Sequence, residues 1–127
     1  MTVFNAEDRL LKVLNSVREQ VFQDFEVIVI EHGSKDKSLD ILKAWGDPRL
    51  VLETLESNIG RSSVLNNCLN RANGEFIAIL DADDLAHPQR FKAEVQYLNA
   101  NSKIELIGTW TKFVDENDYE VGSSQLH

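Results

Sequence analysis

Hydrophobic positions along the chain follow two alternating spacings. Leu10, Leu14 and Val17 recur at the period of an amphipathic helix. Asn5 lies just ahead of them and is a favourable N-cap residue. Residues 25–30, in contrast, form a short run rich in β-branched side chains, which suits a strand covered on both faces. The same alternation predicts helices at 5–21, 36–45, 61–73 and 88–99, and strands at 25–30, 50–55, 75–80 and 104–114, with a hairpin turn at 115–118 and a returning strand near 119–122.

Strands separated by single helices predict an α/β fold, in which a largely parallel sheet carries helices on both faces. In such a sheet, ligands bind at the carboxyl ends of the strands. Two polar clusters directly follow predicted strands, Glu31-His32-Gly33-Ser34 and Asp81-Ala82-Asp83-Asp84. We therefore expect a ligand site to involve these two clusters.

Composition indicates one folded domain or part of one. The chain has 127 residues, of which 43% are hydrophobic, and no repeat or Pro/Ser-rich linker divides it. Its 13 Lys and Arg against 21 Asp and Glu give a net charge of −8, so no nucleic-acid partner is expected. No apolar run reaches the roughly 18 residues of a membrane span. The single Cys68 excludes an internal disulfide framework and fits a reducing compartment, so a cytoplasmic location is expected.

Asp81, Asp83 and Asp84 place three carboxylates directly after a predicted buried strand. A cation would relieve their mutual repulsion, and all-oxygen ligands favour Mg²⁺ or Mn²⁺ over zinc. Such a metal keeps coordination positions for substrate phosphates. A solvated acidic loop that caps the following helix explains the same residues, and the sequence alone leaves both interpretations open.

Other nucleotide-binding patterns are missing from the sequence. No Gly-x-Gly-x-x-Gly segment and no phosphate loop ending in Gly-Lys-Ser/Thr occurs, which argues against a nicotinamide dehydrogenase and an ordinary nucleoside triphosphatase. Gly33-Ser34, between a strand and a helix, is most simply a turn. No pair of histidines has metal-ligand spacing.

Several short segments occur in an informative order along nearly the whole chain. They are Phe4-Asn5-Ala6-Glu7, residues 23–34, Asn58-Ile59-Gly60, Leu65-Asn66, residues 74–84 and Pro88-Gln89-Arg90-Phe91. In this order and spacing they resemble glycosyltransferase family 2, whose members have the type-A glycosyltransferase fold and use nucleotide-sugar donors. Each segment is a weak signal by itself, and the ordered set is a strong one.

The resemblance implies roles by position. Phe4 would pack against the nucleobase, and Glu31 would accept a base N–H, which suits uracil and favours a UDP-sugar. Asp81 would contact the ribose. Asp83 would bind the Mn²⁺ or Mg²⁺ that bridges the donor diphosphate, with Asp81 and Asp84 supporting it. The other donor-binding residues that the resemblance implies are Asn5, His32, Ser34 and Asn66.

The chain departs from the family in two respects. Glu31-His32 stands where the family has an Asp-Asp pair, which leaves the identity of the nucleobase open. Residues 1–127 also resemble a single incomplete nucleotide-sugar-binding domain, truncated at both ends and lacking the acceptor side. We therefore expect the catalytic base of an inverting transfer to lie outside this chain. The acceptor, carbohydrate or lipid-linked, stays open, as does peripheral membrane association of the full-length protein.

Two other functions fit parts of the pattern. A non-catalytic nucleotide-binding or interaction module of the same fold would keep the strands and both polar clusters. A phosphoacceptor receiver domain shares the length and the acidic pocket, but it needs paired carboxylates after its first strand and a late lysine, and neither is visible. A shortened first strand would leave the edge of residues 25–30 unpaired, so a homo-oligomer is expected.

Overall fold

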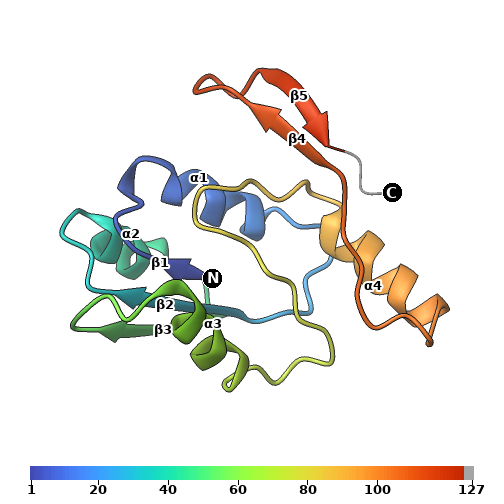
Figure 1. The fold of residues 1–127 in the computed structure, drawn as a ribbon, viewed down its shortest axis with the longest axis horizontal. Helices are drawn as coiled ribbons and strands as arrows, with labels where there is room; N and C mark the ends of the chain where they lie inside the picture. Colours follow the sequence, from blue (N-terminus) through green and yellow to red (C-terminus); the bar gives the residue numbers. More distant parts are fainter. Residues whose placement is uncertain (125–127) are drawn as a thin grey trace. The chain divides into compact units, whose positions relative to one another are not determined.

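The computed structural model describes residues 1–124, which fall into two compact units. The first unit runs from Met1 to Lys92, and the second begins at Ala93 (Figure 1). Every site residue predicted above belongs to the first unit. No helix within residues 1–124 is long and apolar enough to cross a bilayer.

A three-stranded parallel sheet forms the centre of the first unit. Its strands are β1 (Thr2–Val3), β2 (Val27–His32) and β3 (Leu50–Leu55), in the order β1-β2-β3. In the register of the sheet, Thr2 lies beside Ile30, and Val27 lies beside Leu50. β2 is therefore the central strand, and none of its residues is exposed, as its run of β-branched side chains predicts.

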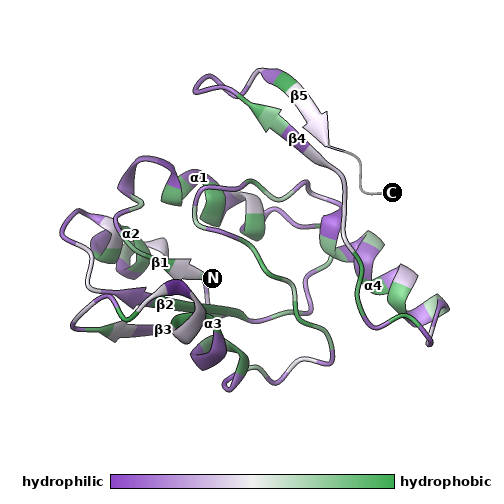
Figure 2. Cartoon of the chain, in the orientation of Figure 1, coloured by the Kyte–Doolittle hydropathy of each residue, from purple (hydrophilic) through white to green (hydrophobic). Residues whose placement is uncertain are grey.

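Helices cover both faces of this sheet. α1 (Glu7–Arg18) and α2 (Ser38–Trp45) belong to the main core with Val27 and Val29 of β2. α3 (Arg61–Leu69) covers the other face, where Val64 packs on Ile30. Alternate residues of a strand point to opposite faces, so neighbouring positions of β2 serve the two layers. Figure 2 shows the hydrophobic residues of α1 and β2 as green stretches of the ribbon.

The helices are shorter than predicted at their ends. The helix predicted at 5–21 spans only Glu7–Arg18, and Ala6, not Asn5, precedes it as the N-cap. Asn5 has a positive φ of 49°, and its Oδ1 accepts a hydrogen bond from the Lys35 N–H at 2.8 Å. The prediction of Asn5 as a helix cap is wrong because its side chain bonds to a neighbouring turn.

Residues 75–80 do not form the predicted buried strand. Within residues 1–124 this segment pairs with no strand, and Phe76, Ile77 and Ile79 are all exposed. Only Leu80 is buried, in the main core. β1 contributes two residues, so the ladder that it could offer to this segment is too short for a stable pair. The hydrophobic run is nevertheless visible as a green stretch of loop after α3 (Figure 2).

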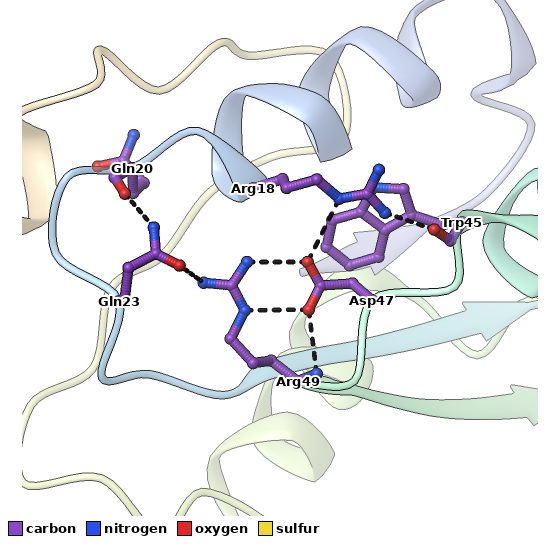
Figure 3. A network of polar contacts seen from close by, with 6 residues as sticks. All are labelled: Arg18, Gln20, Gln23, Trp45, Asp47 and Arg49. Atoms are coloured by element: carbon purple, nitrogen blue, oxygen red, sulfur yellow. Dashed lines mark hydrogen bonds and ion pairs between the residues drawn. The ribbon is translucent and has the colours of Figure 1, made fainter.

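At the amino ends of β2 and β3, the buried carboxylate of Asp47 binds side chains from several segments of the chain (Figure 3). The Asp47 side chain is 3% exposed and accepts hydrogen bonds from Arg49 Nε at 2.9 Å and Nη2 at 2.8 Å. Arg18, at the end of α1, reaches the same carboxylate at 3.5 Å, and its guanidinium lies 4.9 Å from the centre of the Trp45 ring. The hydrogen bonds from Arg49 hold the pKa of Asp47 well below its ordinary value.

The second unit contains most of a helix and a hairpin. α4 (Arg90–Ala100) begins in the first unit and precedes β4 (Thr111–Val114) and β5 (Glu120–Ser124), which pair antiparallel. The Asp115 carboxylate accepts hydrogen bonds from the Asn117 and Tyr119 N–H groups, both at 2.9 Å, and closes the predicted turn. The hairpin is confirmed. The strand predicted at 104–114 begins only at Thr111, which pairs with Ser124.

Candidate functional site

A cleft of about 630 Å³ opens at the carboxyl ends of the parallel strands. Its walls come from four parts of the first unit: β1 with the following turn and the start of α1, the last residue of β2, the loop after β3 with the first residue of α3, and residues 81–83. This is the edge of a parallel α/β sheet at which ligands bind. His32 and Asp81, one residue from each polar cluster, line the same cleft, as the sequence predicts for a shared site.

Two turns on one side of the cleft are bonded to each other. The Asn5 N–H donates to Ser34 Oγ at 3.0 Å, while Asn5 Oδ1 accepts from the Lys35 N–H. One residue further on, the Ala6 N–H donates to Ser38 Oγ at 2.9 Å. These bonds give the β1–α1 turn a fixed place against the turn after β2. Asn5 and Ser34 thus shape the wall of the cleft through their own hydrogen bonds.

The turn after β2 is tight because of Gly33. Its φ is +86°, and a Cβ atom at this position would lie 2.9 Å from the Ser57 Cα. Glu31, only 3% exposed, accepts the Ser34 N–H at Oε1 across this turn at 2.5 Å. Glu31 therefore has a structural contact inside the turn, and it is not among the residues that line the cleft.

An aromatic pair forms one wall of the cleft. The rings of Phe4 and His32 are stacked, with centroids 5.4 Å apart and planes at 29°. Phe4 is 41% exposed, whereas His32 is 4% exposed. The His32 Nδ1 atom is buried and has no hydrogen-bond partner among the described residues. The exposed face of Phe4 offers a flat apolar surface against which a planar ring can pack.

The acidic cluster lies on a loop that is anchored at both ends. Leu80 before it and Ala86 after it are buried in the main core, and the Ala86 N–H donates to Ser16 Oγ at 3.1 Å. Between these anchors, Asp81 and Asp83 line the cleft and Asp84 does not. Asp84 is exposed, but partial loss of hydration raises the pKa of its carboxyl above its ordinary value, and the negative charges of Asp83 and Asp81 raise it further.

Arg61 crosses the cleft to this loop. It is the first residue of α3, and its Nη2 lies 2.6 Å from Asp81 Oδ1. Hydrogen bonding to Asp81 and the charge of that carboxylate raise the pKa of Arg61. Sequence reasoning assigned no role to Arg61, although it directly follows the Asn58-Ile59-Gly60 segment that marked the loop.

The carboxylates of the cleft fit a divalent metal only with help from a ligand. The described residues contain no group of three or more His, Cys, Asp or Glu side chains that could hold a metal by themselves. Asp81 and Asp83 nevertheless bring oxygen donors into one cleft, and Mg²⁺ or Mn²⁺ is commonly held by one or two carboxylates together with substrate phosphates. The donor chemistry therefore suits a metal that arrives with a phosphorylated ligand.

Five of the predicted site residues line the cleft, and four do not. Those that line the cleft are Phe4, Asn5, His32, Asp81 and Asp83. Those that do not line it are Glu31, Ser34, Asn66 and Asp84. Asn66 is an exposed residue of α3. Lining residues that the sequence did not indicate as site residues are Thr2, Ala6, Asp8, Arg9, Asn58, Arg61 and Ala82.

Comparisons with known proteins agree with the fold and with the predicted resemblance. The sequence profile of Glycosyl transferase family 2 matches residues 1–126. An uncharacterized glycosyltransferase of Methanocaldococcus jannaschii is 36% identical over 121 residues, which are 92% of this chain and 42% of that protein. The chain thus spans less than half the length of the curated relatives that it matches first.

Two solved structures with similar folds contain nucleotide sugars. S. aureus TarS in complex with UDP-GlcNAc has a TM-score of 0.75 and 28% identity, over 80% of this chain and 30% of that one. The mannosyltransferase PcManGT from Pyrobaculum calidifontis, in complex with GDP-Man and Mn²⁺, has a TM-score of 0.68 and 28% identity, over 76% of this chain and 30% of that one. These neighbours have the type-A glycosyltransferase fold, so the predicted fold class is confirmed and a receiver domain is not supported.

Proposed function

Because the chain belongs to glycosyl transferase family 2 and is a transferase by resemblance, we propose that its cleft binds the nucleotide-sugar donor of a glycosyl transfer. One observation carries this proposal: a stacked aromatic pair and two carboxylates line the same cleft, at the carboxyl ends of parallel strands. Such a cleft suits a ligand with a planar base at one end and a charged diphosphate at the other. In this proposal residues 1–127 form the donor-binding part of a longer enzyme.

The aromatic pair forms the nucleobase end of the proposed site. The base packs on the exposed face of Phe4, with His32 behind it. Asn5, which lines the cleft, is a further proposed donor-binding residue. Glu31, as the acceptor for a base N–H, and Ser34 and Asn66 keep their proposed donor contacts only if the ligand reaches beyond the cleft lining, because none of the three belongs to it. The TarS neighbour binds UDP-GlcNAc, which supports a UDP-sugar here.

The acidic loop forms the diphosphate end. Asp81 contacts the ribose in this proposal, and Asp83 holds Mn²⁺ or Mg²⁺ with support from Asp81 and Asp84. When bound, the metal neutralises the charge that develops on the diphosphate as the sugar leaves. The Mn²⁺-containing mannosyltransferase neighbour supports this assignment. Inverting transfer also needs a carboxylate base for the acceptor hydroxyl, and we assign that role to none of the described residues.

Calorimetry with UDP tests the proposal. The chain should bind UDP more tightly in Mn²⁺ or Mg²⁺ than in chelator, and Asp83→Asn should remove most of that difference while sparing the fold, because Asp83 is exposed. Asp24→Asn is the matched control, since Asp24 is an exposed carboxylate outside the cleft. Equal affinity in metal and in chelator would contradict the metal assignment, and no binding of any nucleotide would contradict the whole proposal.

A further inference from the structure

Arg61 has a position that structural packing alone does not require. Its side chain is 58% exposed and extends from the first turn of α3 to the acidic loop, which lies 20 residues further along the chain. Gly60, with a positive φ of 86°, and the hydrogen bond from its N–H to Asn58 Oδ1 at 2.9 Å set the turn that directs the chain into α3. The loop and the helix thus meet inside the cleft through a pair of opposite charges.

The charges of the cleft are poorly matched to the ligand proposed above. Its lining includes the carboxylates of Asp8, Asp81 and Asp83 and the guanidinium groups of Arg9 and Arg61. A diphosphate carries at least two negative charges, so it enters this cleft only if positive charge is brought to it. A divalent metal supplies part of that charge, and the Asp81 carboxylate that would support the metal is already paired with Arg61.

From this juxtaposition we propose that Arg61 is an exchangeable cation of the donor site, which pairs with Asp81 and moves to the donor diphosphate when a divalent metal takes its place at the carboxylate. The inference rests on the proposed function and adds a binding residue to it. Guanidinium groups pair with phosphate oxygens through two parallel hydrogen bonds, which gives Arg61 a better partner than a single carboxylate oxygen. The Arg61–Asp81 ion pair is exposed and therefore weak, so breaking it costs little free energy and does not prevent the exchange.

A purely structural role for Arg61 predicts different behaviour. If the ion pair only clips the acidic loop to α3, its removal loosens the loop and weakens the binding of metal, nucleoside and nucleotide together. If Arg61 is an exchangeable cation, it instead competes with the metal for Asp81 and strengthens the binding of the diphosphate. The two roles therefore differ in the sign of the effect on metal binding and in the effect on a ligand that has no phosphate.

Three titrations of the 127-residue chain with Arg61→Gln separate these roles. Mn²⁺ alone, followed by the relaxation of water protons, should bind about threefold more tightly than to the unmodified chain, because its competitor for Asp81 is gone. UDP with Mn²⁺ should bind about tenfold more weakly, because a charge-assisted phosphate contact is lost. Uridine should bind with unchanged affinity.

Two further variants control these titrations. Arg71→Gln removes an arginine that pairs with Glu53 outside the cleft, and it should change none of the three affinities. Arg61→Lys keeps the positive charge, so it should fold as the unmodified chain does and lose less UDP affinity than Arg61→Gln.

The possible failures are distinguishable. Weaker binding of Mn²⁺ and uridine together in Arg61→Gln, or unchanged binding of all three ligands, would overturn the role of Arg61. Failure of the unmodified chain to bind UDP at all would overturn the proposed function itself. If Arg61→Gln does not fold, Arg61→Lys provides the test. Its lysine lacks the planar guanidinium group, so a UDP affinity no lower than that of the Arg71→Gln control would overturn the role of Arg61.

Discussion

Gly33 and Gly60 share a backbone conformation but not an environment. Both have a φ of +86°, in the left-handed region that L side chains rarely adopt. A Cβ at Gly33 would lie 2.9 Å from the Ser57 backbone, whereas a Cβ at Gly60 would meet no atom within 4 Å. Comparing the same substitution at these two glycines therefore separates the free-energy cost of an unfavourable φ from that of a steric clash.

Gly33→Ala should destabilise the chain more than Gly60→Ala. We expect the Gly60 variant to lower the free energy of unfolding by about 1 kcal/mol, from backbone strain alone. The Gly33 variant should lose about 1–3 kcal/mol more, because the turn after β2 must move away from residue 57. Urea denaturation measures both values. Equal losses in the two variants would show that the turn after β2 is not packed as described.

At the residue scale, part of the candidate site could be predicted from the sequence. His32 ends β2, and Asp81 and Asp83 follow residues 75–80, which pair with no strand within residues 1–124, yet all three line one cleft as the sequence predicts. Arg61 could not be found in this way, because its importance depends on a contact 20 residues along the chain. The hydrogen bond from the Ser34 N–H to Glu31 could not be predicted from the sequence either, because residue spacing does not show which way a side chain points.

At the scale of elements, the Asp47 network joins the ends of α1 and α2 to the start of β3. Asp47→Asn should lower the free energy of unfolding by about 2 kcal/mol, because it replaces a buried, charge-assisted pair with Arg49. Glu53→Gln is a suitable control, since the Glu53–Arg71 pair is more exposed and should be worth less than about 1 kcal/mol. Thermal or urea unfolding measures both, and a loss for Asp47→Asn no larger than that of the control would contradict this role.

The same network predicts a dependence of stability on pH. The folded-state pKa of Asp47 is lowered, so the folded protein binds fewer protons there than the unfolded chain does. Its stabilising contribution is therefore complete above the ordinary aspartate pKa and is lost as the pH falls through that value toward the lowered one. The stability of Asp47→Asn should accordingly fall less steeply below about pH 4 than that of the unmodified chain.

Most elements could be predicted from hydrophobic spacing, and the failures have a common cause. β2 and β3 pair with each other along their whole length. β3 occurs where the sequence predicts it, whereas β2 begins and ends two residues later than the predicted 25–30 and so contains Glu31 and His32. Residues 75–80 and 104–110 have equally suitable side chains but no strand beside them within residues 1–124. A strand needs a neighbouring strand for its backbone hydrogen bonds, and that neighbour is often distant in sequence, whereas a helix makes its backbone hydrogen bonds within itself.

At the scale of the whole molecule, β2 does not present the unpaired edge that the sequence predicts, because β1 pairs with it. Residues 2 and 3 form β1 and pair with β2, and the Met1 carbonyl accepts the Ile30 N–H at 3.1 Å. The apolar surface instead includes the exposed side chains of residues 76–79. Association through such a segment is favoured by its apolar residues and unpaired backbone.

We expect the chain to form a dimer or a larger species in solution. Light scattering over a range of concentrations measures its mass, and Ile77→Lys should shift the population toward the monomer by placing a charge in the apolar segment. A chain that stays monomeric at high concentration and unfolds in one sharp transition would contradict this expectation.

The proposed function depends on the binding of a nucleotide in the cleft at the carboxyl ends of the strands. Mapping of backbone amide shifts by nuclear magnetic resonance, during titration with UDP and Mg²⁺, tests it most directly. The largest shifts are expected at Phe4, His32 and residues 81–84, with little change at the Asp47 network or in the β4–β5 hairpin. Shifts concentrated at either of those two places, or none at saturating UDP, would contradict it.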